Sequence, residues 1–468
     1  MAGTKTVAVD YWDKKININV PEDALVLESS PPPGAPNPQE LVRKAIDNPL
    51  GMPPLRELAK KGMKVTIAFD DPCRPAPPRQ VVIPVLLEVL NQAGIPDEDI
   101  TLLCATGNHC KFTKAQLRAY LGQEVFERFW PKGSANRLIN HDCSDPDGLV
   151  YMGVSEMGDY VEYNKLLATS DLFIYCGTVQ SSNWGGMTGC GVIIGLASAR
   201  SMRSTHSWDV VGDPRSCHGD PRTMFYRSHK DAVMDQIEKF IGKKVFYVDC
   251  AVGQGGQVIN VWAGHYKEIQ EPAWKFVESI YQVRCPQADI VVVGIPQFLL
   301  YGDSNNPLIA FTGTTTAPRH WVNKHLVREG GVVIGVAQSN GQVNERLHPS
   351  YNEVMDIYSR CFTAAELYDY EDEFINREDL VFKYRYCHGY HPIHPFWLFY
   401  ESQYIVDHCS KIIMSNVQNP GAFRKLGVEA VKDFDIAFAR AKQIVGPNPR
   451  VIVLPSFWSK PRLQFYVE

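Results

Sequence analysis

Short apolar runs that stop abruptly are the feature that most constrains the fold of this chain. KVTIAF ends in DDPCRP, TLLCAT ends in GNH, DLFIYC ends in GTVQ, and DIVVVG ends in IPQ. KVFYVDC, VVIGVA and RVIVLP end in a similar way. Helix-like stretches such as QVVIPVLLEVLNQAG lie between several of these runs. Continuous apolar strands that alternate with helices predict an α/β fold with mainly parallel sheets.

The chain has 468 residues and 45% hydrophobic content, so it is globular and longer than a typical single domain. Its length therefore indicates more than one domain. The run 267–287 is typical of a helical connector. We therefore expect two α/β domains, at 1–275 and 285–447, with a C-terminal strand at about 448–468 that could return to the first. Parallel sheets bind ligands beyond the carboxyl ends of their strands, so we expect the active site in the cleft between the domains.

Composition excludes several classes of partner. The chain has 47 basic and 52 acidic residues and a net charge of -5, which gives no reason to expect a nucleic acid. It has no apolar run long enough for a membrane span, and its N-terminus alternates like a strand and lacks a signal-peptide core. Its 12 cysteines form no CxxC pair and are expected to be reduced thiols. We expect a cytoplasmic protein.

The peptide DDPCRPAP follows the first of the buried runs and carries Asp71 and Arg74 on a turn stiffened by prolines. Arginine offers a planar fork for phosphate or carboxylate, and a nearby carboxylate could orient that fork, bind a ribose hydroxyl or bind a histidine. Prolines fix the backbone and so preorganise both side chains. A structural ion pair within the turn is the alternative.

Two further peptides could carry chemistry. In TGNHC, His109 follows a glycine turn after a buried strand, and is a candidate base or metal ligand or else a surface histidine. The segment 176–206 is rich in glycine, including Gly186, Gly189 and Gly191, and ends at His206. A glycine-rich turn that opens a helix can bind phosphate, or can simply pack tightly. The spacing matches neither GxGxxG nor the Walker pattern.

Three histidines, His388, His391 and His394, lie three residues apart in YCHGYHPIHPFW. That spacing raises the possibility of a zinc site, and a zinc hydrolase is one reading of the chain. The prolines break any helix that would place the three rings on one face. The better expectation is that one of these histidines contributes to a substrate pocket.

Taken together, these peptides resemble the nickel-pincer nucleotide-dependent lactate racemase family. The stretch KAIDNPLGMPPLRELAKKGMKVTIAFDDPCRPAP is similar to that family's N-terminal half, which carries an Asp–x–x–Arg–Pro turn. ATGNH follows where the family has TGxH, and the glycine-rich segment again ends in a histidine. ADIVVVGIPQFLLYGDSNNP and REGGVVIGVAQSNG resemble the family's second domain. The resemblance covers nearly the whole chain.

The resemblance implies a nickel-pincer nucleotide cofactor, a pyridinium mononucleotide whose sulfur arms and ring carbon hold nickel, with a histidine as fourth ligand. By this resemblance Arg74 would serve the cofactor phosphate and Asp71 would orient the active site. His109 would be a catalytic acid/base, and His206 would be the nickel ligand. Gly186, Gly189, Cys190 and Gly191 would contact the cofactor.

The chain departs from the family at positions that matter. The lysine that tethers the cofactor should lie at position 190 or 188, where the chain has Cys190 and Thr188. The partner acid/base histidine is replaced by Gln180, or by Thr178 in the shifted alignment. The substrate-binding Gln and Lys are absent from GDSNNPLIAFTG, and Cys110 replaces an arginine. Gln180 cannot take up a proton, so His391 or His388 would have to replace the second base.

The sequence therefore predicts a racemase or epimerase that inverts C2 of a 2-hydroxy acid by hydride abstraction and return. Loss of the substrate lysine favours a longer sugar acid, an aldonate such as gluconate. The cofactor would be held noncovalently, unless Cys190 forms a different link, and the cofactor biosynthesis machinery would be a partner. A cofactor- or nickel-binding protein of the same family, without catalysis, is the alternative from another functional class.

Overall fold

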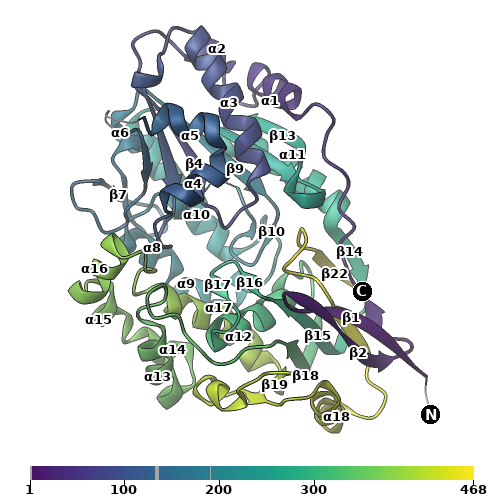
Figure 1. Ribbon diagram of the computed structural model, residues 1–468. Coiled ribbons are helices and arrows are strands. Elements are labelled where there is room, and N and C mark those ends of the chain that lie inside the picture. Colours follow the sequence, from purple (N-terminus) through teal and green to yellow (C-terminus); the bar gives the residue numbers. More distant parts are fainter. Residues whose placement is uncertain (1–2, 132–135, 190) are drawn as a thin grey trace.

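The computed structural model describes residues 3–131, 136–189 and 191–468, and its fold is α/β, as the sequence predicts. Two large sheets form the two ends of the molecule (Figure 1). The first sheet is parallel except for the pairing of its edge strand β13 with β12. Its order is β13 (Val258–Gly264), β12 (Phe246–Val252), β9 (Leu172–Val179), β4 (Val65–Asp70), β5 (Ile100–Ala105), β6 (Leu138–Asn140).

The second sheet has the order β2-β1-β15-β18-β19-β20, with β21 paired to β15 and β3 paired to β21. Only the hairpin of β1 with β2 is antiparallel. The strands are β1 (Thr4–Trp12), β2 (Lys14–Pro21), β3 (Leu25–Val26), β15 (Ala288–Pro296), β18 (Val327–Val336), β19 (Lys411–Ser415), β20 (Glu429–Ala430), β21 (Val451–Leu454).

Four two-stranded ribbons lie outside these sheets. They are β7 (Leu149–Val154) with β8 (Tyr160–Asn164), β10 (Ser181–Ser182) with β11 (Gly186–Met187), β14 (Gln282–Cys285) with β22 (Gln464–Val467), and β16 (Phe298–Leu299) with β17 (Gly302–Asp303). The pair β14–β22 joins the chain's last strand to the segment that leads into the second sheet.

Helices cover the sheets and fill the space between them (Figure 1). The helices in the first half of the chain are α1 (Pro38–Asp47), α2 (Leu55–Leu58), α3 (Pro77–Gln92), α4 (Lys114–Leu121), α5 (Gln123–Phe129), α6 (Leu166–Thr169), α7 (Val192–Gly195), α8 (Ala199–His206), α9 (Trp208–Val211), α10 (Phe225–Ile241) and α11 (Tyr266–Tyr281). The later helices are α12 (Pro307–Thr316), α13 (Tyr351–Cys361), α14 (Ala364–Tyr368), α15 (Glu371–Ile375), α16 (Glu378–Tyr386), α17 (His394–His408) and α18 (Phe434–Val445).

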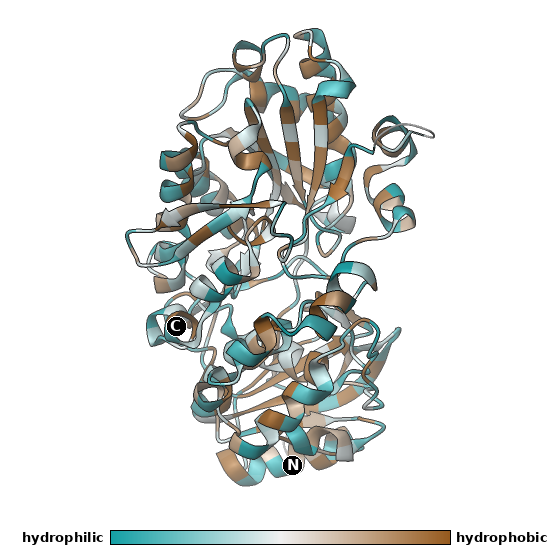
Figure 2. Cartoon of the chain, turned by 90° about the vertical axis from the view of Figure 1, so that its left-hand side faces the viewer, coloured by the Kyte–Doolittle hydropathy of each residue, from teal (hydrophilic) through white to brown (hydrophobic). Residues whose placement is uncertain are grey.

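The apolar runs identified in the sequence are the buried strands of the two sheets. All eight residues of β9 and all seven of β12 are buried. Helices on both faces explain why these strands are continuously apolar rather than alternating. Figure 2 shows the apolar bands along the central strands in both halves of the molecule. This burial fixes the strand ends, and therefore the polar turns that follow them.

The strand pairing divides the chain differently from the expected 1–275 and 285–447. The first strands, β1 to β3, belong to the second sheet, because β1 pairs with β15 and β3 pairs with β21. The run RVIVLP forms β21 and also joins the second sheet, at β15, rather than returning to the first. The central position of β15 was not evident from the sequence, and this strand pairs both with β1 near the N-terminus and with β21 in the C-terminal segment.

Candidate active site

An inner pocket lies where the carboxyl ends of β4 and β5 meet loops and α17 from the second half of the chain. Its interior volume is about 120 Å³. From the first half it is lined by residues of the turn after β4, of the TGNH turn after β5 and of the glycine-rich segment. From the second half come Tyr301, His394, Trp397 and Arg462. The pocket therefore lies between the two sheets, as the rule for parallel strands predicts.

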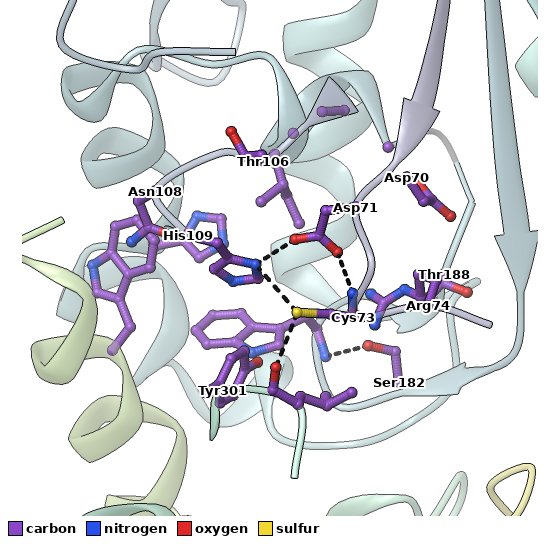
Figure 3. Close-up of a pocket in the computed structure, with 18 of the residues that line it drawn as sticks. Asp70, Asp71, Cys73, Arg74, Thr106, Asn108, His109, Ser182, Thr188 and Tyr301 are labelled. Carbon is purple, nitrogen blue, oxygen red and sulfur yellow. Dashed lines mark hydrogen bonds and ion pairs between the residues drawn. The ribbon is translucent and has the colours of Figure 1, made fainter. Parts of the chain in front are cut away.

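Asp71 and His109 form a hydrogen-bonded pair in this pocket (Figure 3). The Asp71 Oδ2 and the His109 Nδ1 lie 2.6 Å apart, and the other Asp71 oxygen accepts the backbone N–H of Cys73. Burial opposes the ionisation of Asp71, but His109 and Arg74 lower the pKa of this carboxyl below its usual value. The carboxylate thus accepts the Nδ1 proton, which leaves the Nε2 of His109 able to exchange a proton with a ligand.

Cys73 lies beside this pair, and its Sγ is 3.7 Å from the His109 Nδ1. Among the described residues, Asp71, Cys73 and His109 are the group whose ligand atoms lie close enough to share a metal ion. Burial and the neighbouring Asp71 raise the pKa of the Cys73 thiol, however, and the thiol donates a hydrogen bond to the Leu300 carbonyl at 3.0 Å. We therefore interpret the group as a hydrogen-bonded cluster around a proton-transfer histidine.

The guanidinium of Arg74 faces the pocket beside Cys73 and Thr188 (Figure 3). Burial opposes its charge, yet Asp70 and Asp71 raise the pKa of Arg74. It does not form an ion pair with any residue that the structure describes. Asp70 instead pairs with the fully buried Arg79 at 2.8 Å, a structural contact that the sequence analysis did not identify. The structural ion pair in this turn is thus Asp70–Arg79, and Arg74 is available to a ligand.

His206 is the last residue of α8, is buried, and lines the inner pocket. Its ring stacks on Trp397, with centroids 4.6 Å apart, and contacts Trp184. The Nδ1 lies 3.1 Å from the Met202 carbonyl, and the Tyr226 hydroxyl lies 2.9 Å from the Nε2. Burial lowers the pKa of His206 to about 3, so the imidazole is neutral at pH 7. A neutral, oriented imidazole at a pocket wall is suited to metal ligation.

The glycine-rich segment approaches the pocket only in part. Gly189 and Gly191 line it, and Gly189 has φ of +108°, which favours glycine. Gly186 instead lies in β11, where an added Cβ would be 2.5 Å from the Pro221 backbone nitrogen, so its role is packing. The helix that follows, α7, has only four residues, so its N-terminus carries only a weak dipole with which to bind a phosphate. Cys190 lies outside the described residues.

Gln180 does not line the inner pocket but an outer cavity of about 830 Å³. Cys73, Leu300 and Arg462 line both spaces, so the two adjoin at these residues. The wall of the outer cavity is largely polar and includes Glu28, Ser29, Gln254, Gly255, Gly256, Ser459 and Lys460. Gln180 therefore does not lie beside His109 in the inner pocket. It lines the outer cavity, into which a ligand in the inner pocket could extend.

The three histidines of YCHGYHPIHPFW do not converge. His388 is exposed and its Nδ1 lies 2.9 Å from the Lys111 carbonyl oxygen. His391 is buried away from the pocket, with its Nε2 3.0 Å from the Ser144 hydroxyl. Only His394 lines the pocket, since it begins α17. The alternative of a zinc site is therefore not formed by these three residues, and the expected contribution of His391 to catalysis is not supported.

His394 is the pocket histidine that the sequence analysis did not select. Its ring lies 5.3 Å from that of His109, and its Nδ1 lies 2.7 Å from the Tyr351 hydroxyl. Burial and the neighbouring His109 hold the pKa of His394 well below its usual value. The only sequence signal for this choice was the Pro395 that follows, which marks a helix start and so separates His394 from His391.

Proteins with similar sequences include lactate racemases. A family described as the lactate racemase N-terminal domain matches residues 11–219. The lactate racemase of Lactiplantibacillus plantarum is 26% identical over 420 residues, which cover 89% of this chain and 89% of that protein. The lactate racemase of Thermoanaerobacterium thermosaccharolyticum is 23% identical over 363 residues, covering 75% and 78%.

Solved structures show the same fold. The lactate racemase apoprotein from Thermoanaerobacterium thermosaccharolyticum superposes with a TM-score of 0.72 at 20% identity, covering 96% of this chain and 98% of that one. A protein from Thermotoga maritima gives a TM-score of 0.59 at 14% identity, covering 94% and 100%. The chain is thus similar in sequence and fold to lactate racemases over most of its length, and its residues 11–219 match the lactate racemase N-terminal domain family.

Proposed function

We propose that this protein is a nickel-pincer nucleotide-dependent racemase or epimerase that inverts C2 of a 2-hydroxy acid. Its family relationship supports a racemase of hydroxy acids. The observation that carries the proposal is the set of side chains around the inner pocket. A carboxylate-oriented histidine, His109, and a neutral buried histidine, His206, line the same pocket.

The residues present fit the proposed cofactor. The Nδ1 of His206 donates its proton to the Met202 carbonyl, so the Nε2 carries the lone pair. This Nε2 could bind nickel if the Tyr226 hydroxyl, which now donates a hydrogen bond to it, moved away. Trp397 stacks on the His206 ring and Trp184 contacts it, so both supply flat apolar surfaces beside it. Arg74 would serve the phosphate, and the adjoining outer cavity has room for the nucleotide. When bound, the cofactor would supply an acceptor and donor for the C2 hydride.

The chain's own residues would handle the proton of the substrate hydroxyl. His109 would remove it through Nε2, since Asp71 holds the Nδ1 proton and stabilises the imidazolium that forms. Tyr301 and Tyr390 pack around the His109 ring, with centroid distances of 5.6 and 5.4 Å. These rings would limit the access of water to a 2-keto acid intermediate.

We propose His394 as the second proton-transfer group, in place of the His391 expected from the sequence. It is the first residue of α17 and lines the pocket, and its ring centroid lies 5.3 Å from that of His109. A neutral imidazole can accept a proton from a hydroxyl that binds in the opposite orientation. Inversion requires the substrate to react on both faces, and two histidines on different elements could serve the two orientations.

The finer parts of the proposal concern substrate and attachment. The polar outer cavity could take a hydroxylated chain, which favours a sugar acid such as gluconate. The cofactor would be noncovalent, although Lys230 of α10 is buried and lines the inner pocket.

We expect the protein to lie in the cytoplasm and the cofactor biosynthesis machinery to be its partner. Over the described parts of the chain, none of the helices is both long and apolar enough to cross a membrane.

The proposal is tested by producing the chain together with the cofactor biosynthesis machinery and measuring nickel content, intact denatured mass and C2 inversion. We expect about one nickel per chain, an unmodified mass, and conversion of D-gluconate to its C2 epimer. An added nucleotide mass would contradict noncovalent attachment, and peptide mapping would show whether Cys190 or Lys230 carries it. Nickel without inversion of any 2-hydroxy acid would instead favour the binding-protein alternative.

A further inference from the structure

Arg462 is a buried arginine that the proposed reaction has not used. It lies in the segment that connects β21 to β22, so it enters the site from the very end of the chain. Only 5% of its surface is exposed. Burial of a guanidinium is costly unless an anion or several hydrogen-bond acceptors surround it. Arg462 therefore needs an explanation.

The described residues provide little compensation for this charge. The Nη1 of Arg462 is 3.4 Å from the Ser181 carbonyl, a long hydrogen bond, and the guanidinium carbon lies 5.2 Å from the Trp458 ring centroid. None of the ion pairs among the residues that the structure describes includes Arg462. Glu401 is an acid whose charge favours protonated Arg462, but burial raises the pKa of Glu401 to about 7, and its carboxyl oxygen accepts a hydrogen bond from Asn183.

A second arginine increases the cost. Burial and the positive charge of Arg74 lower the pKa of Arg462 to about 9, so the side chain stays charged at neutral pH while facing a like charge. Both guanidinium groups line the inner pocket. Two like charges in a space of low polarity repel one another unless an anion lies between them.

The position of Arg462 is at the junction of the two spaces. Arg74 lines only the inner pocket, whereas Arg462, with Cys73 and Leu300, lines both the inner pocket and the outer cavity. An oxyanion at this junction could accept hydrogen bonds from both forks, since each guanidinium presents paired N–H groups. A ligand could then extend from it into either space.

We propose that Arg462 and Arg74 together form a two-guanidinium site for one oxyanion at the junction of the inner pocket and the outer cavity. This inference rests on the proposed function for the identity of the anion, which is either the carboxylate of the 2-hydroxy acid or the phosphate of the nucleotide. It also gives a reason why the chain lacks the substrate-binding lysine expected in the GDSNNP loop: an arginine from the C-terminal segment supplies the cation.

The experiment compares Arg462→Gln and Arg462→Lys with the parent chain, all produced with the cofactor biosynthesis machinery. Arg450→Gln is the matched control, because Arg450 is an exposed arginine just before β21 that lines neither the inner pocket nor the outer cavity. Calorimetric titrations use D-gluconate and its neutral amide, and nickel content reports cofactor retention. Thermal midpoints of all four proteins confirm folding.

If the anion is the carboxylate, Arg462→Gln weakens gluconate binding by about ten- to a hundredfold and leaves the neutral amide unaffected. If the anion is the phosphate, Arg462→Gln loses nickel while the control retains it. Arg462→Lys should keep part of either property, because it keeps the charge without the fork. Unchanged gluconate binding together with unchanged nickel content in Arg462→Gln would overturn the proposal.

The site can also be tested when the proposed function fails. If the parent chain holds no nickel and inverts no hydroxy acid, titration with inorganic phosphate measures the anion site alone. The proposal then requires that the parent chain and the Arg450→Gln control bind phosphate and that Arg462→Gln binds it at least about tenfold more weakly. Equal phosphate affinity in all three, or no phosphate binding by the parent chain, would overturn the two-arginine site.

Discussion

At the scale of single residues, the account depends most on the hydrogen bond between Asp71 and His109. Replacing His109 with Asn should lower kcat for C2 inversion by about 10²- to 10⁴-fold, the range for loss of a general base. Asp71→Asn should lower it less, by about 10- to 10³-fold, since the base remains but its Nδ1 proton is no longer held by a carboxylate. Both variants should retain nickel. An activity within twofold of the parent in His109→Asn would contradict the role of His109.

The second histidine gives a paired test. His394→Asn should lower kcat for inversion by about tenfold or more, because one of the two substrate orientations loses its proton acceptor. His391→Asn is the matched control, since His391 lies on the same segment but its Nε2 pairs with Ser144 outside the pocket. Initial rates measured separately from each C2 epimer check this. Equal loss in the two variants would mean that His394 acts only through folding.

The sequence predicts that residues following adjacent parallel strands lie close together. It does not predict contacts between elements that are distant in the chain. Asp71 follows β4 and His109 follows β5, and these parallel neighbours end at the same sheet edge. His206 closes a segment that the sequence marked by its glycines. His394 and Arg462 reach the pocket from α17 and from the C-terminal segment, through packing between distant parts of the chain. No local spacing encodes that packing, and so His391 was selected instead.

At the scale of elements, α7 packs closely against the end of β5 and fixes the position of the TGNH turn that follows β5. The Gly107 N–H donates to the Gly195 carbonyl at 2.9 Å, and a Cβ added at Gly195 would lie 2.6 Å from the Ala105 Cβ. Gly195→Ala should therefore lower the free energy of unfolding by about 1–3 kcal/mol and displace the turn that carries His109.

Denaturant unfolding and initial rates measure these two effects. Gly3→Ala serves as the control, because its added Cβ would meet Glu22 only at ordinary contact distance, 3.6 Å. If Gly195→Ala were as stable and active as Gly3→Ala, the contact between α7 and β5 would not be positioning His109. The existence of β5 and of the glycine turn was predictable from the sequence, whereas this contact was not, because it joins segments nearly ninety residues apart.

At the scale of the whole molecule, a buried acid in the second half of the chain should make stability depend on pH. Burial raises the pKa of Glu371 to about 7, although Trp397 and Tyr400 donate hydrogen bonds to it. The folded chain thus keeps a proton that the unfolded chain releases at lower pH. Stability should fall as pH rises from about 5 to 7, by up to about 3 kcal/mol from this group.

Glu371→Gln should flatten this pH dependence, because its side chain does not titrate. Glu373→Gln, an exposed neighbour on α15, should leave the slope unchanged. Urea unfolding at pH 5, 6 and 7 measures the free energy for each protein. An identical slope in the parent and Glu371→Gln would show that Glu371 is ionised in the folded chain across this range.

The central claim is that a hydride leaves C2 and returns to it within a closed site between the two sheets. The most direct test is inversion of gluconate deuterated at C2 by the nickel-loaded protein in ordinary water. The account predicts that the inverted product retains deuterium at C2, since the hydride does not mix with solvent protons. Inversion with loss of deuterium to solvent would contradict the account and indicate removal of a C2 proton by a base.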